Sequence, residues 1–256
     1  MKAVLLAGGK GIHFPGTGKT IPKAMVKIGE TPFMCHIMKM LASYGVNDFI
    51  VAAGRQQYEM KKYFLDFYAH QNDILIDLSS NEFEIDESSR VNWKVRVCDT
   101  GHETKTGGRI KRLAKYLEKN EPFIMVYGDT IADVDINLLL DNHKKSGKKA
   151  TITVYNASQR FGVIELGENG TVKGFRRQSD QSSFVNIGFM VLEPSVLDLI
   201  EGDETVLEKY PLEELARQKD LNSYVHRGYY IKMDKINDLE ELNALYESGC
   251  APWESL

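Results

Sequence analysis

The sequence predicts an α/β fold built on a doubly wound, mixed but mostly parallel sheet. Three observations support this prediction. An apolar run at 3–7 is followed directly by a glycine-rich loop, strand-like runs then alternate with helix-like segments, and closely spaced short strands begin at about Lys148. We expect one domain over 1–256, in which 1–147 forms the alternating half and 148–256 a smaller sheet region.

Composition narrows the classes of protein to consider. The chain has 256 residues, 43% of them hydrophobic, which is enough for one well-packed core. A formal net charge of -4 gives no overall basic field for nucleic acid, and no apolar run approaches the roughly 18 residues that span a bilayer. Cys35, Cys98 and Cys250 form no C-x-x-C pair, so neither zinc nor a disulfide framework is indicated. We expect a cytoplasmic protein with no nucleic-acid or membrane partner.

Strand and helix signals alternate through the first half. The segment 32–44 places four apolar residues at helical spacing, and Gly45 follows where a glycine commonly ends a helix. The acidic, serine-rich excursion at 80–90 is expected to be a surface loop. The elements predicted for this half are strands at 3–7, 48–53, 72–79, 93–97 and 123–127 and helices at 32–44, 57–69 and 110–119.

Short strands dominate the second half. Asn169-Gly170 is a strong hairpin signal between two of them. The predicted strands lie at 150–154, 162–166, 172–175, 186–192 and 221–226, and the predicted helices at 196–201 and 212–218. Together the halves predict a Rossmann-like sheet whose first half binds a nucleotide and whose second half binds an acceptor.

Polar residues that follow strands are the candidates for chemistry, because ligands of open α/β sheets bind beyond the carboxyl ends of the strands. The loop 8–23 combines glycines, which let backbone N–H groups approach phosphate, with Lys10, Lys19 and Lys23. Asp129 and Asp234 each follow an apolar run. Two carboxylates and a lysine-bearing glycine loop suit a Mg²⁺-dependent reaction of a nucleoside triphosphate.

The order of these motifs along the chain resembles the sugar nucleotidyltransferases. Thr106-Gly107-Gly108-Arg109 and the terminal Ala251-Pro252-Trp253 resemble the cytidylyl branch of that family, whose members join CTP and glucose 1-phosphate. The resemblance covers essentially the whole chain, through the motifs LLAGGKG at 5–11, PKAMV at 22–26, HIMKM at 36–40, DTG at 99–101, YGD at 127–129, ADVDI at 132–136, RFG at 160–162 and MD at 233–234.

The resemblance implies a role for each matching residue. Direct attack of an acceptor phosphate oxygen on the α-phosphorus needs positioning and charge neutralisation but no covalent nucleophile. It also implies Mg²⁺ as cofactor, a homo-oligomer, and a place in making precursors of cell-surface polysaccharides. The implied sites are nucleotide contacts at Leu6, Ala7, Gly8, Gly9, Gly11, Lys23, Gly107, Gly108 and Arg109, catalytic residues Lys23 and Asp129, metal ligands Asp129 and Asp234, and acceptor contacts at Phe161, Gly162 and Asn186.

The sequence departs from the family pattern at two places. His13 stands where the family has a triphosphate-binding arginine, so a bidentate guanidinium is replaced by a conditionally charged imidazole. Arg177-Gln178 stands where the family has a sugar-binding glutamate and a phosphate-binding lysine, and Arg176 precedes it. We assign His13 to the nucleotide site and the Arg176–Arg177 pair to the acceptor site.

Alternatives stay open at several of these residues. Asp129 and Asp234 could cap helices or turns, His13 could be a solvated loop residue, and Arg176 and Arg177 could be a solvated strand end.

The sequence leaves three hypotheses for the function of the protein. The first is a cytidylyltransferase for CTP and a small phosphorylated acceptor such as glucose 1-phosphate. The second takes CTP and a non-sugar acceptor that is phosphorylated or phosphonylated, with or without a carboxylate. The third is a catalytically weakened nucleotide-binding regulator.

Overall fold

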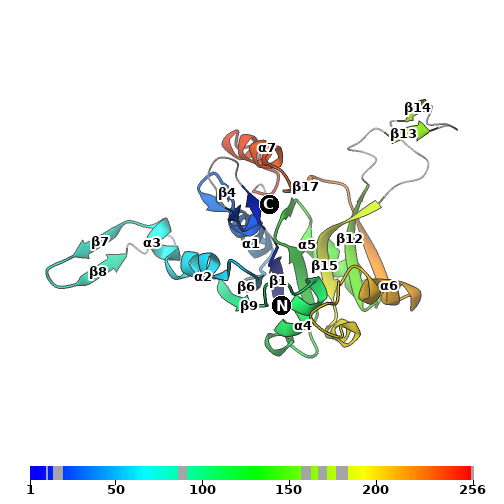
Figure 1. Ribbon diagram of the computed structural model, residues 1–256, viewed down its shortest axis with the longest axis horizontal. Helices are drawn as coiled ribbons and strands as arrows, with labels where there is room; N and C mark the ends of the chain where they lie inside the picture. The colour runs from blue at the N-terminus through cyan, green and yellow to red at the C-terminus, as the bar shows by residue number, and fades with distance from the viewer. Residues whose placement is uncertain are drawn as a thin grey trace.

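Buried apolar strands form the centre of the molecule (Figure 1). The computed structural model describes residues 1–9, 11–13, 20–85, 91–156, 163–166, 172–176 and 184–254. Seven strands form one sheet in the order β16-β12-β15-β10-β1-β6-β9. Their bounds are β1 Lys2–Ala7, β6 Asp48–Ala53, β9 Lys94–Asp99, β10 Phe123–Tyr127, β12 Ala150–Asn156, β15 Phe184–Leu192 and β16 Leu221–His226.

The sheet is mixed and mostly parallel, which confirms the predicted fold class. β1 lies in its interior, parallel to both β10 and β6, and β9 and β16 each run parallel to their single neighbour. Only β15, among the strands of this sheet, runs antiparallel to both of its neighbours, β10 and β12. Strands from both halves of the chain therefore share one sheet, joined where β10 meets β15.

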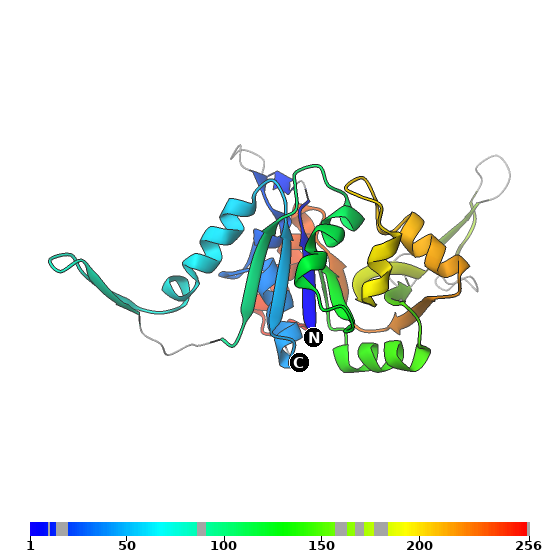
Figure 2. The same cartoon turned by 90° about the horizontal axis from the view of Figure 1, so that it is seen from below.

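Helices cover both faces of the sheet because its central strands are apolar on both sides (Figure 2). Leu5 of β1 belongs to the core on the face of α1, α5 and α7, and Val4 to the core on the face of α4 and α6. The helices are α1 Phe33–Ser43, α2 Gln57–Leu65, α3 Phe67–Gln71, α4 Thr106–Leu113, α5 Ile136–Ser146, α6 Tyr210–Arg217 and α7 Ile236–Glu247.

Five two-stranded pairs decorate this core. The pair of β11 and β17 lies beside the carboxyl end of β10, whereas the β7–β8 hairpin extends away from the body (Figure 1). The pairs are β2 Ile12–His13 with β3 Thr20–Ile21, β4 Lys27–Ile28 with β5 Thr31–Pro32, β7 Ile74–Asp77 with β8 Glu82–Ile85, β11 Thr130–Ala132 with β17 Tyr230–Lys232, and β13 Val163–Leu166 with β14 Val172–Arg176. No helix within the described ranges combines the length and the apolar character that a bilayer span requires.

Several predicted elements differ from the structure. The predicted helix 110–119 already begins at Thr106, because Gly107 and Gly108 pack against a neighbouring loop. It ends at Leu113, where a 3₁₀ turn at Ala114–Tyr116 follows. The predicted loop 80–90 contains β8, which pairs with β7 across a turn where Asn81 has φ +60°. The predicted helix 57–69 is divided between α2 and α3, and 196–201 is a 3₁₀ helix at Pro194–Leu199. Helix α5 was not predicted.

Candidate active site

The carboxyl ends of four parallel strands meet at one edge of the sheet. The register pairs Leu6 with Tyr127, Ala7 with Ala53, and Ala53 with Asp99, so the loops that follow these strands start side by side. Glycine is needed here because the loops touch through their backbones. A Cβ on Gly54 would lie 2.8 Å from the carbonyl oxygen of Gly8, closer than Cβ atoms approach.

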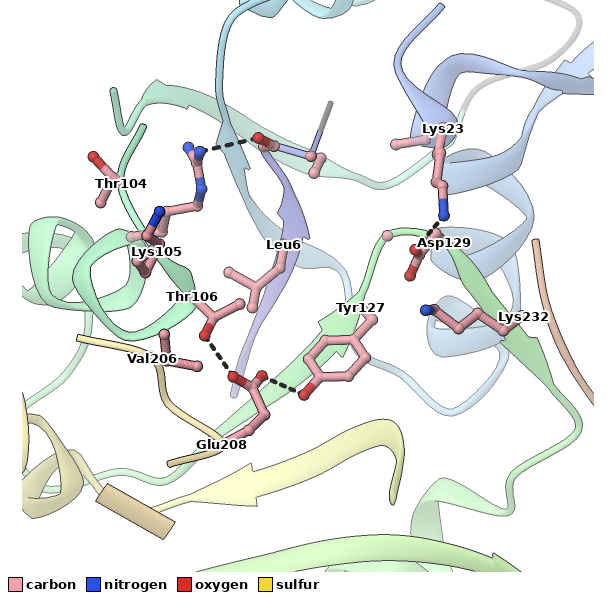
Figure 3. Close-up of a pocket in the computed structure, with 16 residues that line it drawn as sticks. Leu6, Lys23, Thr104, Lys105, Thr106, Tyr127, Asp129, Val206, Glu208 and Lys232 are labelled. Carbon is pink, nitrogen blue, oxygen red and sulfur yellow. Dashed lines mark hydrogen bonds and ion pairs between the residues drawn. The ribbon is translucent and has the colours of Figure 1, made fainter. Parts of the chain in front are cut away.

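These loops line a cavity of about 570 Å³ (Figure 3). Seven of the predicted site residues line it, namely Leu6, Ala7, Gly8, Gly9, Lys23, Arg109 and Asp129. The remaining lining residues are Ala24, Thr104, Lys105, Thr106, Tyr127, Gly128, Val206, Glu208 and Lys232. The cavity thus brings together the glycine loop, the lysine and one of the carboxylates, as the sequence motifs predicted.

Lys23 joins the two predicted metal ligands. Its Nζ lies 3.0 Å from Oδ2 of Asp129 and 2.5 Å from Oδ1 of Asp234. Lys23 begins a short 3₁₀ turn, Lys23–Met25, directly after Pro22. Its ammonium therefore occupies the point on which both carboxylates converge.

The pairing of two strands that are far apart in the sequence brings the two aspartates together. Asp129 lies in the turn between β10 and β11, and Asp234 follows Met233 at the end of β17. β11 pairs antiparallel with β17, with Thr130 opposite Lys232, and Met233 donates its N–H to the carbonyl of Asp129 at 2.9 Å. Neither aspartate lies at the N-cap of a described helix; Asp135 and Lys235 hold those positions for α5 and α7.

The charges at this point reinforce one another. Burial opposes the charge on Lys23, but hydrogen bonds and Coulomb attraction to Asp234 and Asp129 raise its pKa overall. Burial likewise opposes the charge on Asp234, and its contacts with Lys23 and Lys232 outweigh burial and lower its pKa. Lys23 and Asp234 are therefore held in their charged forms near neutral pH.

The residues present fit a magnesium ion. Two carboxylates from different elements already converge on one cationic group, and Mg²⁺ is commonly held by one or two carboxylates together with phosphate oxygens. No group of three or more His, Cys, Asp or Glu side chains that could hold a metal occurs within the described residues. The donor set of Asp129 and Asp234 thus suits a metal that takes most of its ligands from a phosphorylated substrate.

Arg109 fastens the glycine loop to the neighbouring strands. Its guanidinium is buried and donates to the carbonyl of Gly8 at 2.9 Å, to Oγ1 of Thr100 at 2.7 Å and to the carbonyl of Gly101 at 2.8 Å. Longer bonds reach the carbonyls of Ala53 and His102. Arg109 lines the cavity, yet these bonds make it the residue that fixes the position of Gly8.

Other predicted site residues lie outside the cavity lining. Gly107 and Gly108 pack against the loop of Asp203 and Thr205, where added Cβ atoms would lie 2.8 Å and 2.5 Å from backbone atoms. Gly11, with φ +84°, packs against the carbonyl of Ile21.

The remaining predicted residues divide into two groups. The backbones of His13 and Arg176 lie in β2 and β14, and Asn186 lies in β15, where it contacts Tyr127 of the cavity. Phe161, Gly162 and Arg177 lie outside the described residues. The roles assigned to all of these residues stay predictions.

Three charged residues of the cavity lining were not predicted from the sequence, namely Lys105, Glu208 and Lys232. Lys232 ends β17, and its ammonium lies 3.2 Å from Oδ2 of Asp234. Glu208 lies in the loop before α6 and accepts hydrogen bonds from Thr106 and Tyr127. Lys232 stands two residues before Asp234, so an inspection of strand ends could have found it. Glu208 follows no strand and carries no such signal.

Comparison with known proteins shows the family of the chain. The profile of the nucleotidyl transferase family matches residues 2–251. The chain is 40% identical over 256 residues to the glucose-1-phosphate cytidylyltransferase of Salmonella typhi, with 100% of this chain and 99% of the relative covered, and the identity and coverage are the same for that of Salmonella typhimurium.

A solved structure extends the likeness to the fold. HddC from Yersinia pseudotuberculosis, crystallised with GMP-PN, has a TM-score of 0.66 at 22% identity, covering 96% of this chain and 99% of that one. At this identity the likeness concerns the fold alone. The family resemblance read from the sequence motifs is confirmed, and the chain belongs to the nucleotidyl transferase family.

Proposed function

We propose that this protein is a Mg²⁺-dependent cytidylyltransferase that joins CTP and glucose 1-phosphate to give CDP-glucose and pyrophosphate. The observation that carries the proposal is the convergence of Lys23, Asp129 and Asp234 beside the glycine loop. The choice of CTP and glucose 1-phosphate rests on the relatives that are 40% identical over the whole chain.

The proposed reaction needs positioning and charge neutralisation. An oxygen of the acceptor phosphate forms a bond to the α-phosphorus of CTP, the bond from that phosphorus to the bridging oxygen breaks, and the electron pair leaves with pyrophosphate. Lys23 would move from its carboxylate partners to the phosphates, and Arg109 would hold the Gly8 loop against the nucleotide. Bound at Asp129 and Asp234, Mg²⁺ would neutralise phosphate charge.

Other proposals for the function are weaker on the same observations. A catalytically inactive regulator would not need the three charged groups to converge, yet all three do. A carboxylate-bearing acceptor was suggested by Arg176 and Arg177, but the relatives that are 40% identical over the whole chain are glucose-1-phosphate cytidylyltransferases. A sugar phosphate therefore remains the better acceptor. A role in forming polysaccharide precursors and a cytoplasmic location stay predictions.

Self-association is a further part of the proposal. The β7–β8 hairpin extends from the body and exposes Leu75, Leu78 and Phe83, whose fractional exposures are 66%, 89% and 70% (Figure 1). A two-stranded hairpin with exposed apolar side chains is only marginally stable by itself, so a second copy of the chain would be expected to cover it. Sedimentation velocity would test this; a purely monomeric protein at micromolar concentration would contradict it.

Pyrophosphate release from CTP tests the enzymatic proposal. The purified chain is incubated with Mg²⁺, CTP and glucose 1-phosphate, and UTP, dTTP and other phosphorylated acceptors are compared under the same conditions. We expect fast, saturable turnover with CTP and glucose 1-phosphate and formation of CDP-glucose. Turnover with another acceptor alone would contradict the proposed substrate, and the absence of turnover with every pair would contradict the proposed activity.

A magnesium titration tests the metal proposal. Asp234→Asn removes one carboxylate charge, and we expect the Mg²⁺ concentration for half-maximal rate to rise about tenfold or more. Glu240→Gln is the matched control, because Glu240 is an exposed carboxylate on α7 and its substitution removes the same charge. An unchanged magnesium dependence in Asp234→Asn would contradict the assignment.

A further inference from the structure

Glu208 is held in the cavity wall by two hydroxyl groups. Its Oε2 accepts from Oγ1 of Thr106 at 2.6 Å, and its Oε1 accepts from the hydroxyl of Tyr127 (Figure 3). These donors come from α4 and from the end of β10, far apart in sequence. The carboxylate is therefore fixed in orientation without a cationic partner in either bond.

A backbone N–H sets the direction of each hydrogen-bond chain. The N–H of Leu207 donates to Oγ1 of Thr106 at 2.9 Å, so the threonine proton is directed at Glu208. On the other side, the N–H of Gly188 donates to Oδ1 of Asn186 at 2.9 Å, which leaves the Asn186 amide to donate to the Tyr127 hydroxyl.

Tyr127 is also kept in its donor form. Burial raises its pKa, and the nearby negative charge of Glu208 raises it further, so the hydroxyl keeps its proton. Two series of hydrogen bonds, each starting at a backbone N–H, thus end on the carboxylate of Glu208. With its two bonds directed this way, Glu208 can only accept hydrogen bonds, and its further lone pairs are available to a ligand.

We propose that Glu208 is the specificity residue that accepts hydrogen bonds from the sugar hydroxyls of the acceptor. This inference rests on the proposed function and names the part of the substrate that the residue recognises. A carboxylate fixed as an acceptor binds hydroxyl or amino donors and repels phosphate and carboxylate groups. It therefore favours an acceptor that presents hydroxyl groups, rather than a second anionic group, at this position of the cavity.

The position of Glu208 favours the sugar over the nucleotide base. The ring of Tyr127 lies between Glu208 and Asp129, so Glu208 faces a different part of the cavity from the phosphate-binding group Lys23 (Figure 3). The glycine loop and Arg109, by contrast, lie over β1, β6 and β9. Glu208 is bonded to Thr106 at the start of α4, and through Tyr127 and Asn186 it is connected to β15, on the opposite side of β1 from that loop.

Steady-state kinetics of Glu208→Gln test the proposal. Glutamine keeps the volume but replaces one acceptor oxygen with a donor group. We expect the KM for glucose 1-phosphate to rise about tenfold while the KM for CTP stays within about twofold of wild type. Glu204→Gln, an exposed glutamate of the preceding loop, is the matched control and should leave both KM values unchanged. Glu208→Asp, which keeps the charge but shortens the reach, should lie between the two.

A panel of monodeoxy glucose 1-phosphates identifies the contact. For at least one analogue, the KM should be higher than that for glucose 1-phosphate in wild type but not in Glu208→Gln. Removing the hydroxyl or the carboxylate removes the same hydrogen bond, so the two changes should not add. A higher KM for CTP alone would mean that Glu208 contacts the base and would overturn the proposal, as would a variant indistinguishable from Glu204→Gln. If wild type turned over no sugar phosphate, the proposed function would fail separately, and calorimetric titration of glucose 1-phosphate into both proteins would still decide whether Glu208 binds its hydroxyls.

Discussion

The ammonium of Lys23 lies 2.5 Å from Oδ1 of Asp234, although 211 residues separate them in the chain. In the proposed reaction, a cation bound by Asp129 and Asp234 would free this ammonium to contact the phosphates of the substrate. The contact would therefore place a cation beside the substrate before it binds.

Replacing Lys23 separates these two contributions. Lys23→Met should lower kcat about 100-fold, because the developing phosphate charge loses a positioned cation. It should also raise the pKa of Asp234, which loses its principal cationic partner. Pyrophosphate-release kinetics and an NMR titration of the carboxyl groups measure the two effects. Lys27→Met, at an exposed lysine paired with Glu30, should change neither quantity, and equal rates for the two variants would contradict the role of Lys23.

Gly188 is predicted to be indispensable for the position of Tyr127. It has φ +82°, and a Cβ there would lie 2.2 Å from Cδ2 of the Tyr127 ring. Gly188→Ala should lower the free energy of unfolding by more than about 2 kcal/mol, since backbone strain and the ring clash add.

Gly147 supplies the matched control for that prediction. It has φ +61° at the end of α5, but nothing lies within 4 Å of the position of its Cβ. Gly147→Ala should therefore cost about 1–2 kcal/mol from the backbone alone. Urea unfolding measures both variants, and equal costs would mean that the Tyr127 ring moves aside freely.

The sequence anticipated the parts of this site that depend on local chemistry. Strand β1, the glycine loop, Lys23 and the two aspartates all followed from apolar runs and the polar residues after them. The pairing of β11 with β17, which brings Asp234 to Asp129, joins segments far apart in the chain, so no local pattern could predict it. The same holds for Glu208, whose partners belong to α4 and β10.

Long-range packing also explains where predicted boundaries failed. Two consecutive glycines normally weaken a helix, so the start of α4 was predicted too late. In the structure Gly107 and Gly108 lie inside α4 because only glycine allows the backbone of the loop at Asp203 and Thr205 to approach so closely. The cost in helix propensity is offset by the packing of these glycines against the backbone of that loop, which the local sequence does not indicate.

His36 should make the protein less stable at mildly acidic pH. Its ring is buried between Oε1 of Glu254, 2.8 Å from Nδ1, and the carbonyl of Ile28, 3.1 Å from Nε2. Burial lowers its pKa, and the hydrogen bonds to Ile28 and Glu254 offset this only in part. Below the unfolded pKa of about 6.5 the unfolded chain therefore binds more protons, and stability falls until the pH passes the folded pKa.

Thermal unfolding as a function of pH tests this prediction. Between about pH 7.5 and pH 5.5 the melting temperature of wild type should fall more steeply than that of His36→Gln, which carries no titrating ring. His70→Gln, at an exposed histidine, is the control and should keep the wild-type slope. The same slope in all three proteins would show that His36 does not titrate differently in the folded and unfolded states.

Arg109 should prove necessary for both stability and nucleotide binding. The five acceptors around its guanidinium come from the end of β6 and from the loops after β1 and β9. A lysine ammonium, by contrast, has three protons on one nitrogen. Arg109→Lys should leave buried carbonyls without donors, cost about 2–4 kcal/mol of unfolding free energy and raise the KM for CTP about tenfold. Arg112→Lys, at an exposed ion pair with Asp203, should cost less than about 1 kcal/mol and leave the KM unchanged. If Arg109→Lys lowered stability but not CTP affinity, Arg109 would hold the strands together without controlling the glycine loop, because the bond to Gly8 is the one that links it to the nucleotide site.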